Sequence, residues 1–340
     1  MVVTIKHVAE AAGVSPKTVS RVINGEAHVS PAKRDAVMRV VRELDYRPNA
    51  FARSLSSSRS YLLGLLIDDP ASGYAADVQL GAINACRDKS YHLLVERVDR
   101  GEPDWRRTLT AALDQLRLDG ALLPPPLCDD PEVLDLLDEV GLPYVRIAPG
   151  GEEARSGFVR MDDAAAAAEM TRHLIALGHR RIGFIGGKPD HDAAAKRLDG
   201  FTREMAAHGL TVDPELVRPG DFEVRSGMVA GDAILSRNDP PSAIFASNDD
   251  MALGVLMVAY RHHLDVPGDL AIAGFDDAPT ARAAWPPITT IVQPNGAMAA
   301  AAVEMLADPR YRGDPRDPVW RRLLDYRLVV RGSTDPASIE

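Results

Sequence analysis

Polar residues that can hydrogen-bond to a hydroxylated small molecule follow several apolar segments of this 340-residue sequence. Carboxylates and amides accept and donate the bonds that sugar hydroxyls require, while Arg197 offers a guanidinium and Phe222 an aromatic face. Asp and Asn are also common helix N-caps, so a single pair is at least as readily a cap as a ligand contact. Convergence of the groups at one place would favour a binding site. The groups are Asp68-Asp69, Asp162-Asp163, Ser247-Asn248-Asp249 and Asp276-Asp277.

Parallel β-sheets are the elements that would bring these groups together. Alternating strands and helices predict an α/β fold with two lobes built on doubly wound parallel sheets. Such sheets bind ligands beyond the carboxyl ends of their strands, and two facing lobes place that crevice between them. Strands are predicted at 62–67, 91–96, 121–123, 144–147, 157–161, 181–185, 243–246, 270–274 and 326–330, and helices near 76–89, 104–117, 131–140, 163–177, 192–208, 225–236, 249–262 and 295–306.

Another polar set lies on one face of a predicted short helix near the start of the chain. Apolar spacing and the Ser15-Pro16 and Ser30-Pro31 starts predict helices at 5–12, 16–23 and 31–44, with Gly13 in the first turn. Two helices joined by a tight turn, with a third closing the core, form a helix-turn-helix whose second helix enters the major groove of DNA. The alternative is an ordinary solvent-exposed helix face that binds no partner. The outward residues that can bind bases or phosphates are Ser15, Lys17, Thr18, Ser20, Arg21 and Asn24.

Charge divides the chain into two unlike parts. Residues 1–60 carry a net charge of +5 and the remaining residues −15, which gives the total of −10. A small basic head on an acidic body favours a polyanionic partner at one end, and nucleic acid is the obvious candidate.

The head resembles the DNA-binding domain and hinge of the LacI/GalR repressor family, through TIKHVAEAAGVSPKTVSRVING at 4–25 and VSPAKRDAVMRVVRELDYRPNAFARSLSS at 29–57. The resemblance implies that Lys17 and Arg21 contact operator bases. Pro16 replaces the polar or aromatic residue that some members use as their first specificity contact. The remaining positions that the resemblance places on phosphates, in a groove or in the hinge are Thr4, Ser15, Thr18, Ser20, Asn24, His28, Asn49 and Arg53.

The hinge around Leu55 is expected to order on DNA, because one or two helical turns are too short to be stable alone. In the family, a leucine from each subunit wedges into the minor groove, and Leu55 matches that position. The alternative is a linker leucine that packs on the body.

The same resemblance extends over the acidic body, through HLIALGHRRIGFIGG at 173–187, RLDGF at 197–201, IFASNDDMALGVL at 244–256, and IAGFDDAP and WPPITTIVQP at 272–294. It implies that Arg197 clamps an effector, that Phe222 stacks on its ring, and that Gln293 lies where the chain crosses back between lobes. The other implied contacts are Asp163, Asn248 and Asp276, with weaker candidates in the first lobe at Asp69, Ser72, Tyr74 and Pro125.

These observations predict a helix-turn-helix domain followed by a two-lobed body that resembles periplasmic binding proteins. The expected parts are residues 1–48 for the DNA-binding domain, 49–60 for the hinge helix and linker, 61–159 with 294–323 for the N-terminal effector subdomain, 160–293 with 324–332 for the C-terminal subdomain, and 333–340 for the tail.

The predicted function is a sequence-specific transcriptional repressor whose operator affinity is changed by a small molecule. A carbohydrate inducer is expected, and the alternative is a co-repressor such as a nucleobase or a sugar phosphate. An effector that closes the lobes would change the separation of the paired hinges and so the affinity for DNA. No leucine heptad follows the body, so a homodimer that reads a near-palindromic operator is expected.

Other classes of protein are not favoured. The nine histidines do not supply the spacing of a catalytic or metal site, and GFIGGKPD at 183–190 lacks the order of a phosphate-binding loop. No enzyme, cofactor or metal is therefore expected. A transport sugar-binding protein would carry a signal peptide and no basic head, so a cytoplasmic location is predicted. Cys86 and Cys128 are expected to be packing residues.

Overall fold

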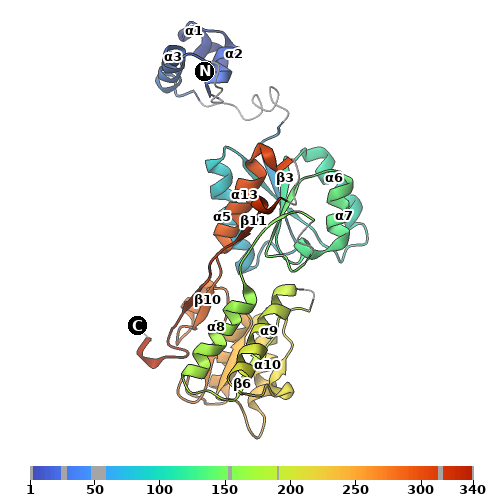
Figure 1. Cartoon of the computed structure of the whole chain (residues 1–340), viewed down its shortest axis with the longest axis vertical. Helices are drawn as coiled ribbons and strands as arrows, with labels where there is room; N and C mark the ends of the chain where they lie inside the picture. Colours follow the sequence, from blue (N-terminus) through green and yellow to red (C-terminus); the bar gives the residue numbers. More distant parts are fainter. Residues whose placement is uncertain are drawn as a thin grey trace. The chain divides into compact units, whose positions relative to one another are not determined.

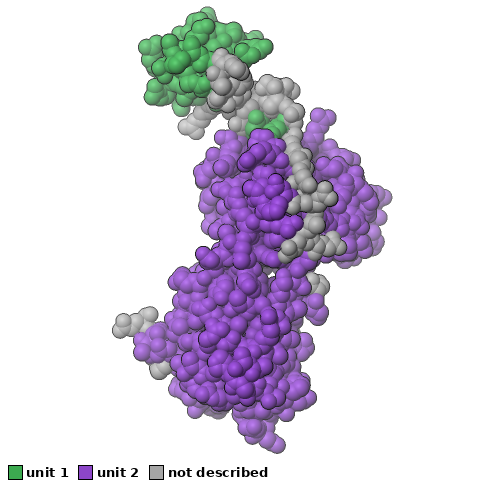
Figure 2. All heavy atoms as spheres, viewed as in Figure 1, with its two compact units in different colours: residues 1–61 green, residues 62–340 purple. Residues whose placement is uncertain are grey.

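The computed structural model describes residues 3–23, 29–46, 59–151, 155–189, 191–312 and 317–338. The chain forms two compact units, residues 1–61 and 62–340, which Figure 2 shows in separate colours.

The first unit is a three-helix bundle. Its helices are α1 (Ile5–Ala11), α2 (Pro16–Ile23) and α3 (Pro31–Glu43), as the sequence predicted to within one residue at most ends. Ser15 caps α2, since its Oγ accepts a hydrogen bond from the backbone N–H of Thr18 at 3.2 Å. Gly13 takes a φ of +63° in the turn before it, a conformation that glycine adopts without steric cost. The apolar core is Val8, Ala9, Val19, Val22, Val37, Val40 and Tyr46.

A six-stranded parallel sheet begins the second unit, in the order β11-β5-β4-β3-β1-β2. Helices α5 (Gly73–Asp88) and α13 (Asn295–Ala307) cover one face, and α6 (Trp105–Leu116) and α7 (Pro131–Glu139) cover the other (Figure 1). The strands are β1 (Leu62–Ile67), β2 (His92–Arg97), β3 (Gly120–Leu123), β4 (Tyr144–Ile147), β5 (Gly157–Arg160) and β11 (Arg321–Leu323).

A four-stranded parallel sheet, ordered β7-β6-β8-β9, forms the other half of this unit. Helices α8 (Asp163–Ala176) and α9 (Asp192–Ala207) pack on one face, and α10 (Val224–Leu235) and α11 (Asp249–Arg261) pack on the other, each pair over its own apolar core. The strands are β6 (Ile182–Ile185), β7 (Val217–Arg218), β8 (Ala243–Ala246) and β9 (Ala271–Ala273).

The structure adds elements that the sequence did not predict. β10 (Thr290–Val292) pairs antiparallel with β12 (Arg327–Val329), so the strand predicted at 326–330 belongs to a small separate sheet. The short helix α12 (Pro279–Ala283) follows β9. β7, β10 and β11 are only two or three residues long and are formed by pairing with strands distant in the sequence.

The packing of α5 against α13 requires glycine at position 81. A Cβ atom at Gly81 would overlap the backbone of Gly296, whereas a Cβ at Gly73 of the same helix would meet nothing within 4 Å. The two helices therefore approach at a distance that only a missing side chain allows.

Gly81→Ala is expected to lower the free energy of unfolding of the second unit by about 1–3 kcal/mol, because the extra methyl group forces the helices apart. Urea denaturation followed by circular dichroism would measure the change. Gly73→Ala is the matched control and is expected to leave the midpoint unchanged or slightly raised. Equal midpoints for the two variants would contradict this account of the contact.

Candidate functional site

A buried guanidinium lies at the centre of the candidate site in the second unit. Arg197 of α9 is 4% exposed, and its Nε donates to Oδ1 of Asp163 at 2.9 Å. Its Nη1 donates to the backbone oxygen of Ser247 at 2.6 Å and lies 3.7 Å from Oδ1 of Asp276. The guanidinium also sits 3.7 Å from the centre of the Phe275 ring. Residues that follow β5, β8 and β9 thus meet around one cation, as expected for carboxyl ends of parallel strands.

Asp276 is held in this cluster by its backbone and by Gln293. Its φ is +114°, outside the regions that side-chain-bearing residues usually occupy, and Nε2 of Gln293 donates to its Oδ1 at 2.5 Å. Burial raises the pKa of Asp276 to about 6, and the nearby Arg197 guanidinium opposes that shift. The predicted contacts Asp163, Arg197, Asp276 and Gln293 therefore share one hydrogen-bonded cluster.

Asp249 supports the loop that carries Asp276. It is fully buried, and its two carboxylate oxygens accept from the hydroxyl of Thr290 and the backbone N–H of Ala278, both at 2.7 Å. Burial raises the pKa of Asp249 well above its usual value, and the Asp276 carboxylate adds to the effect. The sequence places Asp249 in the polar group Ser247-Asn248-Asp249, but Asp249 was not among the predicted ligand contacts. The residues around it in the sequence do not indicate that its side chain binds Thr290 and Ala278.

Asn248 and Phe222 form a second pair near the start of α11. Oδ1 of Asn248 accepts from the backbone N–H of Met251 at 2.9 Å, so the N-cap alternative is correct for this residue. Its Nδ2 donates to the backbone oxygen of Phe222 at 2.9 Å, which fixes a residue with a φ of +71°. The Phe222 ring lies 5.2 Å from the His191 ring and over Gly187, where a Cβ atom would overlap it. Asn248 thus caps a helix and positions the aromatic ring.

The candidates near β1 and β3 differ in what they contact. Oδ1 of Asp69 accepts from the N–H of Ala71 at 3.0 Å, and Oγ of Ser72 caps α5 by accepting from the N–H of Ala75 at 3.2 Å. These side chains shape the turn into α5, and in the described part of the chain they make no bond to the Arg197 cluster. Pro125 is half-buried after β3.

Tyr74, near the start of α5, is influenced electrostatically by the charges of the Arg197 cluster. Its hydroxyl is buried and has no hydrogen-bond partner among the described residues. Burial raises the pKa of Tyr74 well above its usual value, and the charges of Cys128, Asp276 and Asp163 raise it further. A buried hydroxyl without a partner beside paired charges is suited to hydrogen-bond to a bound polar molecule.

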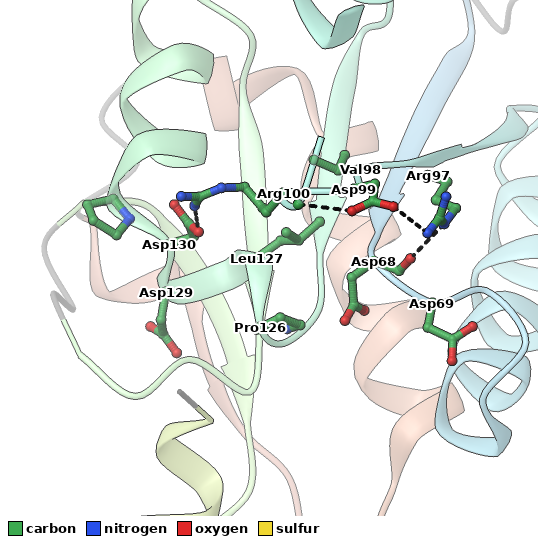
Figure 3. Close-up of a pocket in the computed structure, with 12 residues that line it drawn as sticks. Asp68, Asp69, Arg97, Val98, Asp99, Arg100, Pro126, Leu127, Asp129 and Asp130 are labelled. Atoms are coloured by element: carbon green, nitrogen blue, oxygen red, sulfur yellow. Dashed lines mark hydrogen bonds and ion pairs between the residues drawn. The ribbon is translucent and has the colours of Figure 1, made fainter. Parts of the chain in front are cut away.

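Sequence analysis placed Ser247 in a polar group without predicting it as a contact, and it did not predict an open cleft near β1 and β2. The Oγ of Ser247 is buried without a partner in the described ranges, while its carbonyl holds Arg197. The cleft has a volume of about 630 Å³ and lies at the carboxyl ends of β1 and β2 and after β3 (Figure 3). Position at the end of a strand was the only signal for its residues. They are Asp68, Asp69, Arg97, Val98, Asp99, Arg100, Gly101, Pro126, Leu127, Asp129, Asp130 and Pro131.

In the first unit, α2 presents several predicted residues outward. Ser15, Pro16 and Lys17 are exposed, and Thr18, Ser20 and Arg21 are half-buried. Thr4 is exposed at the start of α1, where its N–H donates to Nδ1 of His7 at 3.2 Å. The other predicted contacts lie outside the described residues; they are Asn24, His28, Asn49, Arg53 and Leu55.

Within the described residues, no group of three or more His, Cys, Asp or Glu side chains could hold a metal ion. No described helix has the length and apolar character that crossing a membrane requires. Cys86 and Cys128 are both buried and free, and burial raises the pKa of the Cys86 thiol to about 11.

Comparison with known proteins gives matches over nearly the whole chain. Residues 4–49 match the family of bacterial regulatory proteins described as the lacI family, and residues 171–334 match a periplasmic binding protein-like domain. The HTH-type transcriptional regulator CelR of Thermobifida fusca is 36% identical over 337 residues, which cover 97% of this chain and 98% of that protein. The HTH-type transcriptional repressor PurR of Klebsiella pneumoniae (strain 342) is 35% identical over 336 residues, 97% of each chain.

Two solved structures also match nearly the whole of this chain. A complex of the transcriptional regulator CelR with cellobiose has a TM-score of 0.74 and 35% identity, and the match covers 97% of this chain and 99% of that one. The lac repressor dimer bound to operator and the anti-inducer ONPF has a TM-score of 0.75 and 26% identity, with 98% and 99% covered.

The raised pKa of Asp276 predicts a pH effect on stability. The folded chain holds this proton more tightly than the unfolded chain, whose pKa is near the ordinary 3.8, so the carboxyl group stabilises the fold below pH 3.8 and loses that contribution as the pH rises through about 6. Between pH 5 and pH 7.5 the wild type is expected to lose about 1 kcal/mol more unfolding free energy than Asp276→Asn, which cannot ionise. Urea denaturation at both pH values measures this difference. Parallel pH profiles for the two proteins would show that Asp276 does not titrate as described.

Proposed function

Since the chain belongs to the LacI family of bacterial regulatory proteins, we propose that it is a sequence-specific transcriptional repressor whose operator affinity is controlled by a neutral sugar. The observation that carries this proposal is the similarity to CelR and PurR over 97% of the chain, because it includes both the helix-turn-helix unit and the unit that holds the Arg197 cluster. LacI-type proteins are regulators and not enzymes.

The DNA contacts are proposed on the exposed side of the first unit. Lys17 and Arg21 on α2 carry the ammonium and guanidinium donors, respectively, that suit the acceptor edge of guanine. Ser15, Thr18 and Ser20 lie beside them on the same helix or at its cap, where short hydroxyl side chains can hold phosphates. Leu55 remains the proposed minor-groove wedge of the hinge. The other proposed DNA-binding residues are Thr4, Pro16, Asn24, His28, Asn49 and Arg53.

A neutral effector is favoured by the charges around Arg197. One guanidinium faces two carboxylates, Asp163 at 2.9 Å and Asp276 at 3.7 Å, so the cluster holds no uncompensated positive charge for a phosphate group. The free hydroxyls of Tyr74 and Ser247 suit a ligand that both donates and accepts hydrogen bonds. The relative solved with cellobiose supports a carbohydrate over a sugar phosphate. The proposed contacts also include Asp69, Ser72, Pro125, Phe222, Asn248 and Gln293.

Control of DNA binding requires the two halves of the second unit to move as lobes. We assign residues 61–159 with 294–323 to one lobe and 160–293 with 324–332 to the other, leaving 1–48 as the DNA-binding domain, 49–60 as the hinge and 333–340 as the tail. An effector that binds between the lobes would change the separation of two hinges in a homodimer. The lac repressor, solved as a dimer on its operator, supports that assembly, which would act on DNA in the cytoplasm.

Lys17→Ala is expected to weaken operator binding by about 1–3 kcal/mol, because it removes a proposed base contact. Fluorescence anisotropy at fixed salt on DNA from upstream of the protein's own gene measures the affinity. The control is Lys89→Ala, which removes an exposed lysine at the end of α5 in the second unit. Equal affinities for these two variants would remove Lys17 from the interface.

Arg197→Lys is expected to reduce the effector response at least tenfold while operator binding without effector persists. Lysine keeps the charge that Asp163 needs, but it loses the planar fork that reaches Ser247 and the ligand together. The measurement is release of operator by cellobiose in the same anisotropy assay. Arg172→Lys, at a two-bond contact with Glu204 between α8 and α9, makes the same chemical change elsewhere. A normal response in Arg197→Lys would exclude Arg197 from the effector site.

A further inference from the structure

A loop that follows β4, in the half of the second unit built on the six-stranded sheet, contacts helix α9 of the other half. The carbonyl oxygens of Pro149 and Gly150 in this loop accept hydrogen bonds from Nζ of Lys196 at 3.4 and 3.3 Å. Lys196 lies on α9, where its Nζ is also 3.0 Å from Oδ2 of Asp192, one turn earlier. An ammonium group has three donors, and this one meets three oxygen atoms, two of them across the boundary between the halves.

The loop is held in place by its own half. The N–H of Gly150 donates to Oδ2 of Asp129 at 2.8 Å. The carbonyl oxygen of Gly151 accepts from Nη1 of Arg146 at 2.9 Å. Arg146 lies on β4 and is fully buried, and its Nε donates to Oγ of Ser156 at 3.0 Å. Because a buried guanidinium must keep its hydrogen-bond partners, the loop has a defined position against which α9 packs.

The backbone of Gly150 also packs directly on the side chain of Asp192. A Cβ atom at Gly150 would overlap that side chain, whereas a Cβ at Gly151 would meet nothing within 4 Å. Neither glycine has a φ in the left-handed region, so the backbone of both positions accepts alanine. The obstacle to a side chain at position 150 is therefore the helix of the other half.

The same part of α9 carries proposed effector contacts. Arg197 is the next residue after Lys196. The ring of His191, at the N-cap of α9, lies 5.2 Å from the ring of Phe222. A helix moves as a rigid element, so a change in the distance between α9 and the loop also moves the Arg197 guanidinium. The contact between the halves and the effector site are therefore mechanically linked.

We propose that the contact of Lys196 and Asp192 with Pro149 and Gly150 is a latch between the two halves, and that it stabilises the arrangement that binds the effector. The inference rests on the proposed function, because it needs an effector that binds between the halves. Lys196 is then a positioning residue, which acts on the ligand through α9 and Arg197. Since the latch and the effector favour the same arrangement, loss of the latch lowers the fraction of protein that is ready to bind and weakens the observed affinity in proportion.

The first test measures cellobiose binding by isothermal titration calorimetry on the full-length protein. Lys196→Met keeps the length of the side chain and removes its donors, so it is expected to weaken binding about three- to tenfold, the effect of a lost hydrogen bond. Lys196→Arg can still donate to two carbonyl oxygens and is expected to restore binding to within about twofold of the wild type. Lys89→Met, at an exposed lysine at the end of α5, is the matched control and should not alter binding.

A pair of glycine variants tests the packing of the latch. Gly150→Ala places a methyl group against Asp192 and separates the halves, so it is expected to weaken cellobiose binding about three- to tenfold as well. Gly151→Ala adds the same methyl group in open space and should bind like the wild type. Operator binding without sugar, measured by fluorescence anisotropy on each preparation, verifies that the variants are folded.

Hydrogen exchange followed by mass spectrometry tests the latch without any ligand. Peptides that contain residues 148–151 or the first turn of α9 are expected to exchange about three- to tenfold faster in Lys196→Met than in the wild type, because separation of the halves exposes both segments. Lys196→Arg is expected to exchange like the wild type, and so is the control Lys89→Met.

The outcomes separate the latch from the proposed function. Cellobiose binding that is unchanged in both Lys196→Met and Gly150→Ala would overturn the latch and leave a sugar-responsive repressor. Tighter binding in these variants would also contradict the proposal, since the contact would then favour an arrangement that does not bind the effector. If the protein binds operator but no cellobiose, the sugar effector falls. In that case faster exchange in Lys196→Met still supports the latch, and equal exchange overturns it.

Discussion

The Arg197 guanidinium is a full positive charge that is 4% exposed, and the interior around it must supply the contacts that water no longer makes. The Asp163 carboxylate, the Ser247 carbonyl and the Phe275 ring do so, with Asp276 slightly farther away. These groups come from separate elements, so the cation can be buried only when the ends of several strands are correctly placed. Much of the arrangement of this unit follows from that requirement.

The chain segments around the cluster are fastened by further buried polar contacts. Arg331 bonds to the Asp277 carboxylate at 2.5 Å and to the backbone oxygen of Ile288 at 3.0 Å, which anchors the residue next to Asp276. Thr290 of β10 binds Asp249 and is followed, at Gln293, by the side chain that holds Asp276. The loop with two consecutive positive φ values is thus held by contacts on both sides. A ligand that contacts Asp276 would therefore act on residues that tie the end of β9 to the later part of the chain.

Sequence periodicity predicted the long helices and the buried strands well, because their apolar residues recur at regular intervals. It missed β7, β10 and β11, which are two or three residues long and are formed by pairing with residues distant in the sequence. In the first unit, the basic charge and the helix caps are local features of the sequence, and they were sufficient to predict the helix-turn-helix. Asn248 shows what local signals cannot distinguish. A residue that only caps a helix and a residue that also positions another side chain look the same in the sequence. The cleft lined by Asp68 and Arg97 depends on contacts between separate loops, such as the hydrogen bond from Arg97 to the Asp68 carbonyl and the Arg100–Asp130 ion pair, which only the folded chain displays.

In the proposed mechanism, the site around Arg197 and the DNA-binding unit are coupled. Coupling of two binding equilibria is reciprocal, so operator DNA must change the affinity for the effector by the same factor as the effector changes the affinity for DNA. The most direct measurement is the affinity for cellobiose with and without saturating operator. Reciprocal coupling predicts a weaker affinity for cellobiose in the presence of operator, by the factor with which cellobiose weakens DNA binding. Identical affinities in the two conditions would contradict it.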